Sequence, residues 1–109
     1  MIYAEALAWT YAIEVPVVVA AGALWGCGVR RSAVAAVLAS GVTHPVAWSV
    51  ALAMPMEAYY RWGWHIIEAT VCAVEAVVLG RFMHLPGKRS WPLSIVANGL
   101  SALAGRYLF

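Results

Sequence analysis

The sequence predicts an all-α fold: a polytopic membrane protein built as a four-transmembrane-helix bundle with short loops. Of its 109 residues, 64% are hydrophobic and only 11% are charged, whereas roughly 25% are charged in an average soluble domain. A soluble domain of this size would leave about 40% of its chain surface in water, so the composition excludes one. The net charge of +2 is too small to neutralise a run of phosphates, which excludes nucleic acid as a partner.

Four apolar segments are each long enough to cross the hydrocarbon core of a bilayer, which takes ~20 residues. Short connectors separate them, and each connector contains glycine or proline together with charged residues. The first lies around Gly28, the second begins at Pro55 and the third contains Pro86 and Gly87. We therefore expect a single four-helix transmembrane domain over residues 1–109, with helices at about 3–26, 32–54, 64–83 and 91–109.

The basic residues predict how the bundle is oriented, because cytoplasmic loops carry an excess of lysine and arginine. Only Arg61 and Arg106 belong to one end of the predicted bundle, against five basic residues at the other end. We expect the first and third loops in the cytoplasm, both termini outside, and the protein in the inner membrane of a bacterial cell. Aromatic belts are expected at the outer interface (Tyr59, Tyr60, Trp62, Trp64) and at the inner one (Trp25, Trp91). The basic residues of the cytoplasmic end are Arg30, Arg31, Arg81, Lys88 and Arg89.

Each predicted helix carries one strongly polar residue near its midpoint, namely Glu14, His44, Glu75 and Asn98. At a rise of ~1.5 Å per residue, all four fall within a slab roughly 5 Å thick. Charged residues inside a membrane are costly, and they usually face the bundle interior and mark function. The four residues therefore predict an ion- or proton-binding site at the midplane.

Helical spacing places further residues beside this site. Positions three, four or seven apart share one face of a helix, which aligns Cys72 with Glu68 and Glu75. The same spacing relates Ser94, Asn98 and Ser101 on the fourth segment, and Ser40 and His44 on the second. We expect the supporting residues to be Glu68, Cys72, Ser94, Ser101, Ser40, Pro16 and Pro45.

Two prolines lie in the middle of predicted helices, Pro16 after Glu14 and Pro45 directly after His44. A proline inside a helix leaves the carbonyl four residues earlier without its usual partner. Such carbonyls, here those of Ala12 and Gly41, can coordinate a cation or accept hydrogen bonds from neighbouring side chains or water. A packing kink explains the prolines equally well.

The polar residues allow several chemistries. If Glu14 and Glu75 lie close together, both cannot be ionised, so they share a proton or bind a cation. Together with His44 they form a candidate metal-ligand set, for which a divalent ion is the natural cofactor. The alternative is that the glutamates, with Asn98 and the serines, hydrogen-bond across helices and hold them together. His44 itself fits a metal ligand, a haem ligand, a proton shuttle or a core histidine.

Three functions therefore stay open. The first is a small transport or ion-binding protein in which Glu14, His44 and Glu75 bind a proton or metal cation and Asn98 orients them. The second is an accessory or cofactor-holding subunit of a larger membrane complex, with haem held through His44. The third is a small intramembrane enzyme with a carboxylate/His metal site, so whether the chain is an enzyme stays open. Its small size favours a homo-oligomer or a partner membrane subunit, surrounded by membrane lipids.

The length, the four helices and the acidic Glu14 resemble the small multidrug resistance transporters, but the glycine-rich third helix of that family is missing, and Glu68 and Glu75 stand there instead. The chain is more similar to a class of short bacterial four-helix membrane proteins, a resemblance that implies no particular activity. It is carried by four fragments, one from each predicted helix: 14–17, 43–45, 68–75 and 94–101 with Gly105.

Overall fold

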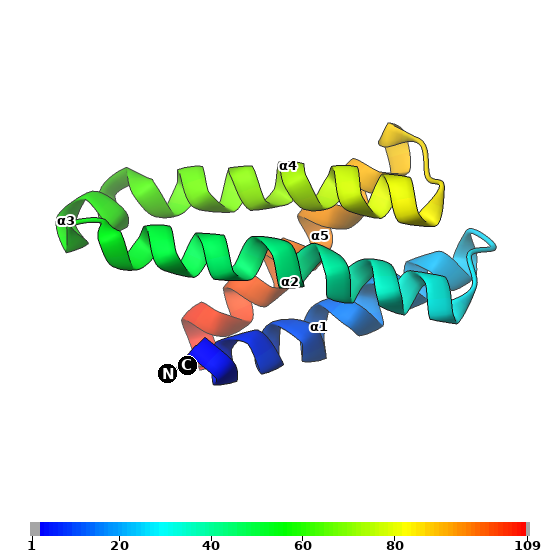
Figure 1. Cartoon of the computed structure of the whole chain (residues 1–109), viewed down its shortest axis with the longest axis horizontal. Helices are drawn as coiled ribbons and strands as arrows, with labels where there is room; N and C mark the ends of the chain where they lie inside the picture. The colour runs from blue at the N-terminus through cyan, green and yellow to red at the C-terminus, as the bar shows by residue number, and fades with distance from the viewer. Residues whose placement is uncertain (1–2, 109) are drawn as a thin grey trace.

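The predicted all-α, four-helix fold is confirmed. The computed structural model describes residues 3–108, and their side chains as far as residue 105. Its four long helices are α1 (Tyr3–Leu24), α2 (Val29–Ala53), α4 (Trp64–Met83) and α5 (Gly87–Leu108). They form an elongated bundle of 44 × 24 × 21 Å (Figure 1). The predicted end of the last helix at Phe109 and the side chain of Arg106 lie outside the described residues.

The two ends of the bundle differ in their connections. The loops that join α1 to α2 and α4 to α5 lie at one end, which we call the basic end because Arg30, Arg31 and Arg81 are exposed there (Figure 1). The short helix α3 (Met56–Ala58) lies at the opposite end, between the end of α2 and the start of α4; the first turn of α1 and the last turn of α5 lie toward the same end of the bundle (Figure 1). We call this the α3 end.

The connector expected at 55–63 is helical, which corrects the sequence prediction. After Pro55 the chain forms α3 and then a π-helical turn, η1 (Tyr59–Gly63), which runs directly into α4. The carbonyl of Pro55 accepts a hydrogen bond from the backbone N–H of Tyr59 at 3.0 Å. No proline or glycine interrupts the chain between Pro55 and Gly63, so the backbone satisfies its own hydrogen bonds as a helix.

Capping decides where α1 and α4 end. At the end of α1, Gly26 has φ 77° and the N–H of Cys27 reaches the carbonyl of Gly22 at 2.7 Å. This is the hydrogen-bond pattern of a Schellman cap, which favours glycine because glycine adopts positive φ without strain. The same arrangement ends α4, where His84 has φ 54° and the Leu85 N–H bonds the Gly80 carbonyl at 2.9 Å. Helix α1 therefore ends two residues earlier than predicted. Helix α2 begins three residues earlier than predicted, and α5 begins four residues earlier.

The helices pack as a ring, α1 against α2, α2 against α4, α4 against α5 and α5 against α1. The surface of this ring is apolar: Leu52 is 73% exposed and Val46 is 63% exposed. The interior holds small and apolar residues together with buried polar groups such as Glu14, Glu75 and Asn98. Buried carboxyl groups inside a surface of large apolar side chains are the reverse of the usual distribution in a soluble domain.

Two of the helices, α1 and α2, are long and apolar enough to cross a membrane. The other two have sufficient length, 20 residues in α4 and 22 in α5. Their sequences are more polar, since α4 alone contains Glu68, Glu75 and Arg81.

The basic half of the bundle is packed with small side chains. Gly22 of α1 lies so close to α2 that an added Cβ would overlap the Ser32 hydroxyl, and Ser32 has no exposed surface. Small residues let helix backbones approach closely, as is typical of membrane helix pairs. The buried apolar cluster of this half consists of Val18, Ala35, Ala36, Ala39, Leu79, Met83, Leu93 and Ala97; we call it the seal.

Candidate functional site

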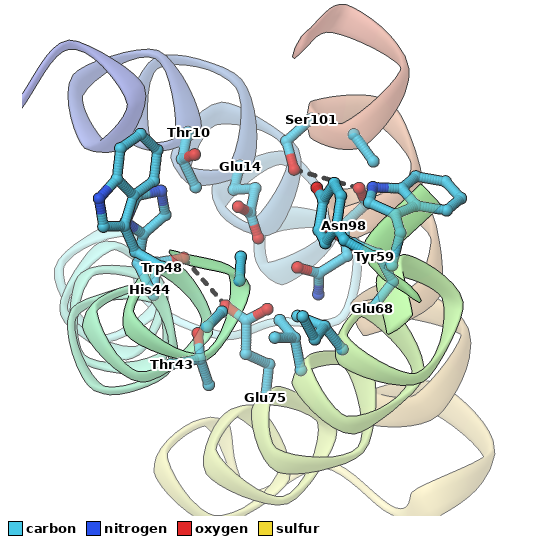
Figure 2. A pocket seen from close by; sticks show the side chains of 17 residues that line it. Thr10, Glu14, Thr43, His44, Trp48, Tyr59, Glu68, Glu75, Asn98 and Ser101 are labelled. Carbon is cyan, nitrogen blue, oxygen red and sulfur yellow. Dashed lines mark hydrogen bonds between the residues drawn. The ribbon is translucent and has the colours of Figure 1, made fainter. Parts of the chain in front are cut away.

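A cavity of about 190 Å³ lies among the four helices on the α3 side of the seal. Along α2 it extends from Ala51 to Ser40, and along α4 from Trp64 to Glu75. Eleven residues of helix correspond to a depth of ~16 Å. We call this space the polar cavity; it is lined by Thr10, Glu14, Ser40, Thr43, His44, Ala47, Trp48, Ala51, Tyr59, Trp64, Ile67, Glu68, Val71, Glu75, Asn98, Ser101 and Ala102 (Figure 2).

Two buried carboxyl groups lie at the inner end of the polar cavity. Glu14 of α1 is 4% exposed and Glu75 of α4 is 3% exposed, and Figure 2 shows both side chains pointing into the space between their helices. They lie within electrostatic range of each other. Like charges this close in a water-poor interior disfavour double ionisation. The two carboxyl groups therefore favour binding one proton or one cation between them.

Only one oxygen of Glu75 has a hydrogen-bond partner among the described residues. The Ser40 hydroxyl donates to its Oε1 at 2.9 Å, which ties α2 to α4. Its Oε2 is buried and makes no hydrogen bond of good geometry in the described part of the chain, although Asn98 and the Glu14 carboxyl lie near the Glu75 carboxyl. A buried carboxylate oxygen without a partner is costly. Protonation removes its charge and makes it a donor, for which the neighbouring Glu14 carboxyl is the available acceptor.

Helix α5 contributes a neutral polar face that is held in place by hydrogen bonds. The Asn98 amide donates to the Ser94 carbonyl at 2.9 Å and lies 3.3 Å from the Ser94 hydroxyl. Ser94 in turn donates to the backbone carbonyl of Cys72 at 2.7 Å, linking α5 to α4. Ser101 donates to the Asn98 carbonyl at 3.1 Å. Asn98 is therefore positioned beside the carboxyl pair by its own helix.

His44 lies on the α2 wall of the polar cavity within an aromatic group. Its ring centroid is 5.1 Å from that of Tyr3 and 6.0 Å from that of Trp48. Its Nδ1 is buried and has no partner among the described residues. His44, Glu14 and Glu75 line the same cavity, yet within residues 3–108 no three His, Cys, Asp or Glu side chains are grouped so that they could hold a metal ion. This arrangement does not support the candidate metal-ligand set.

The outer part of the polar cavity is aromatic and acidic. Trp64 and Tyr59 line it together with Glu68, which lies within electrostatic range of both Glu14 and Glu75. Burial, and secondarily the Glu68 carboxyl, raise the pKa of the Tyr59 hydroxyl above its usual value of 10.0. Tyr59 therefore stays neutral at physiological pH. No lysine or arginine is among the described residues that line the cavity, so its charged side chains are the glutamates.

The seal closes the polar cavity beneath the two glutamates. A void of only about 10 Å³ separates Glu14 and Glu75 from Val18, Ala36 and Leu79. One water molecule needs about 10–15 Å³, so this void holds at most one. The glutamates are thus reached from the α3 side and separated from the basic end by packed apolar residues.

Several residues expected at the site lie elsewhere. Pro16 and Pro45 are exposed on the outer surface, as are Ala12 and Gly41, whose carbonyls were one candidate contribution to the site beside a plain packing kink. The two prolines do not line the cavity. Pro16 faces away from Glu14 on α1, and Pro45 faces away from His44 on α2. Val71, and not Cys72, lies on the cavity wall between Glu68 and Glu75. Ser94 does not line the cavity; its backbone carbonyl accepts a hydrogen bond from the Asn98 amide.

Sequence reasoning missed the aromatic part of the site. Tyr59 and Trp64 were expected in an interfacial belt, but both line the polar cavity. The position of Trp64 was detectable, because Trp64 lies four residues before Glu68 and eleven before Glu75, on one helical face. Thr43 was also missed; its hydroxyl donates to the Ala39 carbonyl at 3.0 Å.

Comparisons with protein-family models, with curated proteins and with solved structures give no match to this chain. The two resemblances drawn from the sequence therefore stay predictions, and the geometry of the site carries the functional argument.

Proposed function

We propose that this chain is a small membrane protein that binds and transfers protons, with Glu14 and Glu75 as the proton-binding groups. One observation carries the proposal: Glu75 Oε2 is buried without a partner beside a second buried carboxyl, that of Glu14. A single proton on this pair relieves both the repulsion and the unpaired oxygen. Ionisable residues of this kind inside membrane helices serve as proton relays in pumps and transporters.

The polar cavity supplies the route by which a proton reaches the pair. It passes Glu68 on the way from the α3 end to Glu75, and polar side chains face it from all four helices. A narrow polar space of this kind can hold water that carries protons. The seal on the far side prevents free leakage, so transfer to the basic end requires a second arrangement of the helices, as in alternating access.

We propose further that all four long helices span the membrane. The polar residues in the middle of α4 and α5 are directed inward, as Glu75 and Asn98 are, whereas the exposed Arg81, Lys88 and Arg89 lie at the basic end. The exposed surfaces of these helices are apolar, with Val77 and Phe82 on α4 and Ile95 on α5 among them. Each helix is also long enough, since 20 residues extend ~30 Å. The exposed arginines of the basic end then lie in the cytoplasm, and the polar cavity opens on the outer side of the inner membrane.

The test compares proton flux through proteoliposomes that contain the wild-type protein, Glu75→Gln or Glu14→Gln. Glutamine keeps the shape and can still accept the hydrogen bond from Ser40, but it cannot take up a proton. We expect wild-type vesicles to dissipate an imposed pH gradient, reported by a trapped pH-sensitive dye, and both variants to lose most of that flux.

Glu57→Gln is the matched control, because Glu57 is exposed at the α3 end and pairs with Arg61 at 2.9 Å. It should retain the wild-type flux. A hydrophobic carbodiimide, which modifies protonated carboxyl groups, provides a second readout: labelling should decrease in Glu75→Gln and should fall as the pH rises. Wild-type flux in Glu75→Gln, or no flux in the wild-type protein, would contradict the proposal.

A further inference from the structure

Four basic side chains surround one groove at the basic end, on the opposite side of the seal from the polar cavity. Arg30 and Arg31 come from the first turn of α2, and Arg81 and His84 from the end of α4. The groove is broad and open, with a volume of about 830 Å³. Apart from these four, it is lined by Gly28, Val34 and Phe82.

No acidic residue is among the described residues that line this groove. The other end of the bundle differs, because Arg61 there is paired with Glu57. Even within the basic end the groove is distinct: Arg89 lies over the Trp25 ring at 5.4 Å, outside the groove. The arginines of the groove thus present positive charge without a carboxylate to balance it. Guanidinium groups bind phosphate in a bidentate manner, so an anionic phosphate is the complementary ligand.

The apolar residues of the groove distinguish a lipid from a free anion. Val34 is 47% exposed and Phe82 is 49% exposed, and each lies within one turn of an arginine, Val34 after Arg31 and Phe82 directly after Arg81. A free phosphate has no apolar part that could pack against Val34 and Phe82. A phospholipid uses both parts, with its phosphate on the arginines and the start of its acyl chains along Val34 and Phe82. Basic pockets between membrane helices on the cytoplasmic side bind anionic headgroups in this way.

We propose that the groove between the start of α2 and the end of α4 is a binding site for an anionic phospholipid, whose headgroup is held by Arg30, Arg31, Arg81 and His84. Occupation would bridge α2 and α4 directly beneath the seal. The site is independent of the proton-binding glutamates, so either proposal can fail without the other.

The test uses the full chain in a non-ionic detergent. Native mass spectrometry counts the lipids that remain bound after addition of phosphatidylglycerol or of phosphatidylcholine with the same acyl chains. We expect retention of phosphatidylglycerol and little retention of phosphatidylcholine. Arg31→Gln and Arg81→Gln should each weaken phosphatidylglycerol binding about fivefold, because each removes one guanidinium from the groove.

Lys88→Gln is the matched control, since it removes one positive charge from the same end at a residue that does not line the groove. It should bind phosphatidylglycerol like the wild-type protein. Thermal unfolding without added lipid checks that all variants fold, which is expected because the substituted residues are exposed. Equal retention of both lipids would overturn the proposal, as would an equal loss in Lys88→Gln. Displacement of the lipid by inorganic phosphate at similar concentration would assign the groove to a free anion and would also overturn it.

Discussion

The two halves of this bundle are built from the same four helices but are packed in opposite ways. Toward the basic end, alanine, glycine and serine bring the helices together, and residues such as Ala35 and Ser32 have no exposed surface. Toward the α3 end, α1 and α5 diverge from α2 and α4 (Figure 1), and the large rings of Trp48 and Trp64 line a cavity. Side-chain size thus determines where the bundle is solid and where it is open, and the two glutamates lie at the boundary.

This boundary gives the carboxyl groups their chemical character. Glu14 and Glu75 meet the polar cavity on one side and the seal on the other. A carboxyl placed fully in the open half would be hydrated and ordinary, whereas one buried in the seal would be unreachable. In the function we propose, this position lets the carboxyl groups exchange a proton with the polar cavity while the seal blocks passage toward the basic end.

The largest expected effect is a difference in accessibility between the two halves. Ala47 and Ala36 both belong to α2, eleven residues apart, but Ala47 lines the polar cavity and Ala36 lies in the seal. We expect Ala47→Cys to react with a small water-soluble methanethiosulfonate at least about tenfold faster than Ala36→Cys, because thiol reactivity follows solvent access. Labelling of the protein in membrane vesicles measures both rates.

Both variants require a background of Cys27→Ser and Cys72→Ala, which removes the two native thiols. The background protein without an added cysteine provides the blank. Equal labelling of the two positions would mean that the seal is not closed, and the comparison between the halves would fail.

The next effect concerns the close approach of α1 and α2 in the small-residue half. Gly22→Ala places a Cβ against the Ser32 side chain, where no free space exists. Overpacking of this kind costs about 1–3 kcal/mol, so the thermal unfolding midpoint in detergent should fall.

Gly99→Ala is the control, because a Cβ at Gly99 would meet nothing within 4 Å. It should raise stability by up to about 1 kcal/mol, as alanine favours helix more than glycine does. Adding Ser32→Ala to Gly22→Ala should recover much of the loss, since it removes a hydroxyl that is buried without a partner. A double variant no more stable than Gly22→Ala would contradict this contact.

The smallest effect tests the hydrogen bond at the boundary. Ser40→Ala removes the donor to Glu75 Oε1, and we expect a loss of about 1 kcal/mol, the usual size for such bonds between membrane helices. Thr70→Ala removes an exposed hydroxyl that, among the described residues, bonds within its own helix to the Ile66 carbonyl, and it should change stability less. If the two variants are equally stable, the Ser40–Glu75 bond does not hold α2 to α4.

Local pattern was sufficient for much of the fold. Runs of apolar residues between glycine and proline predicted four helices, and the helical period placed Glu14, His44, Glu75 and Asn98 around one cavity. The period did not distinguish between adjacent positions on a face, so Val71 takes the place on the cavity wall that was expected for Cys72. Two neighbouring residues differ by about 100° around the helix axis, and only the helices packed on either side decide which one faces inward.

By itself, the sequence determined the all-helical class, the approximate helix ends and the depth of the polar residues, because these depend on composition, capping residues and helical rise. Only the tertiary structure decided that 55–63 continues as α3 and η1, that Tyr59 lines the cavity, and that the prolines face outward. It also decided that the candidate metal ligands are not grouped within the described residues and that the cavity is closed by the seal. These features depend on how closely helices approach one another, and that distance is set by pairs of side chains far apart in the chain, such as Gly22 with Ser32 and Ser40 with Glu75.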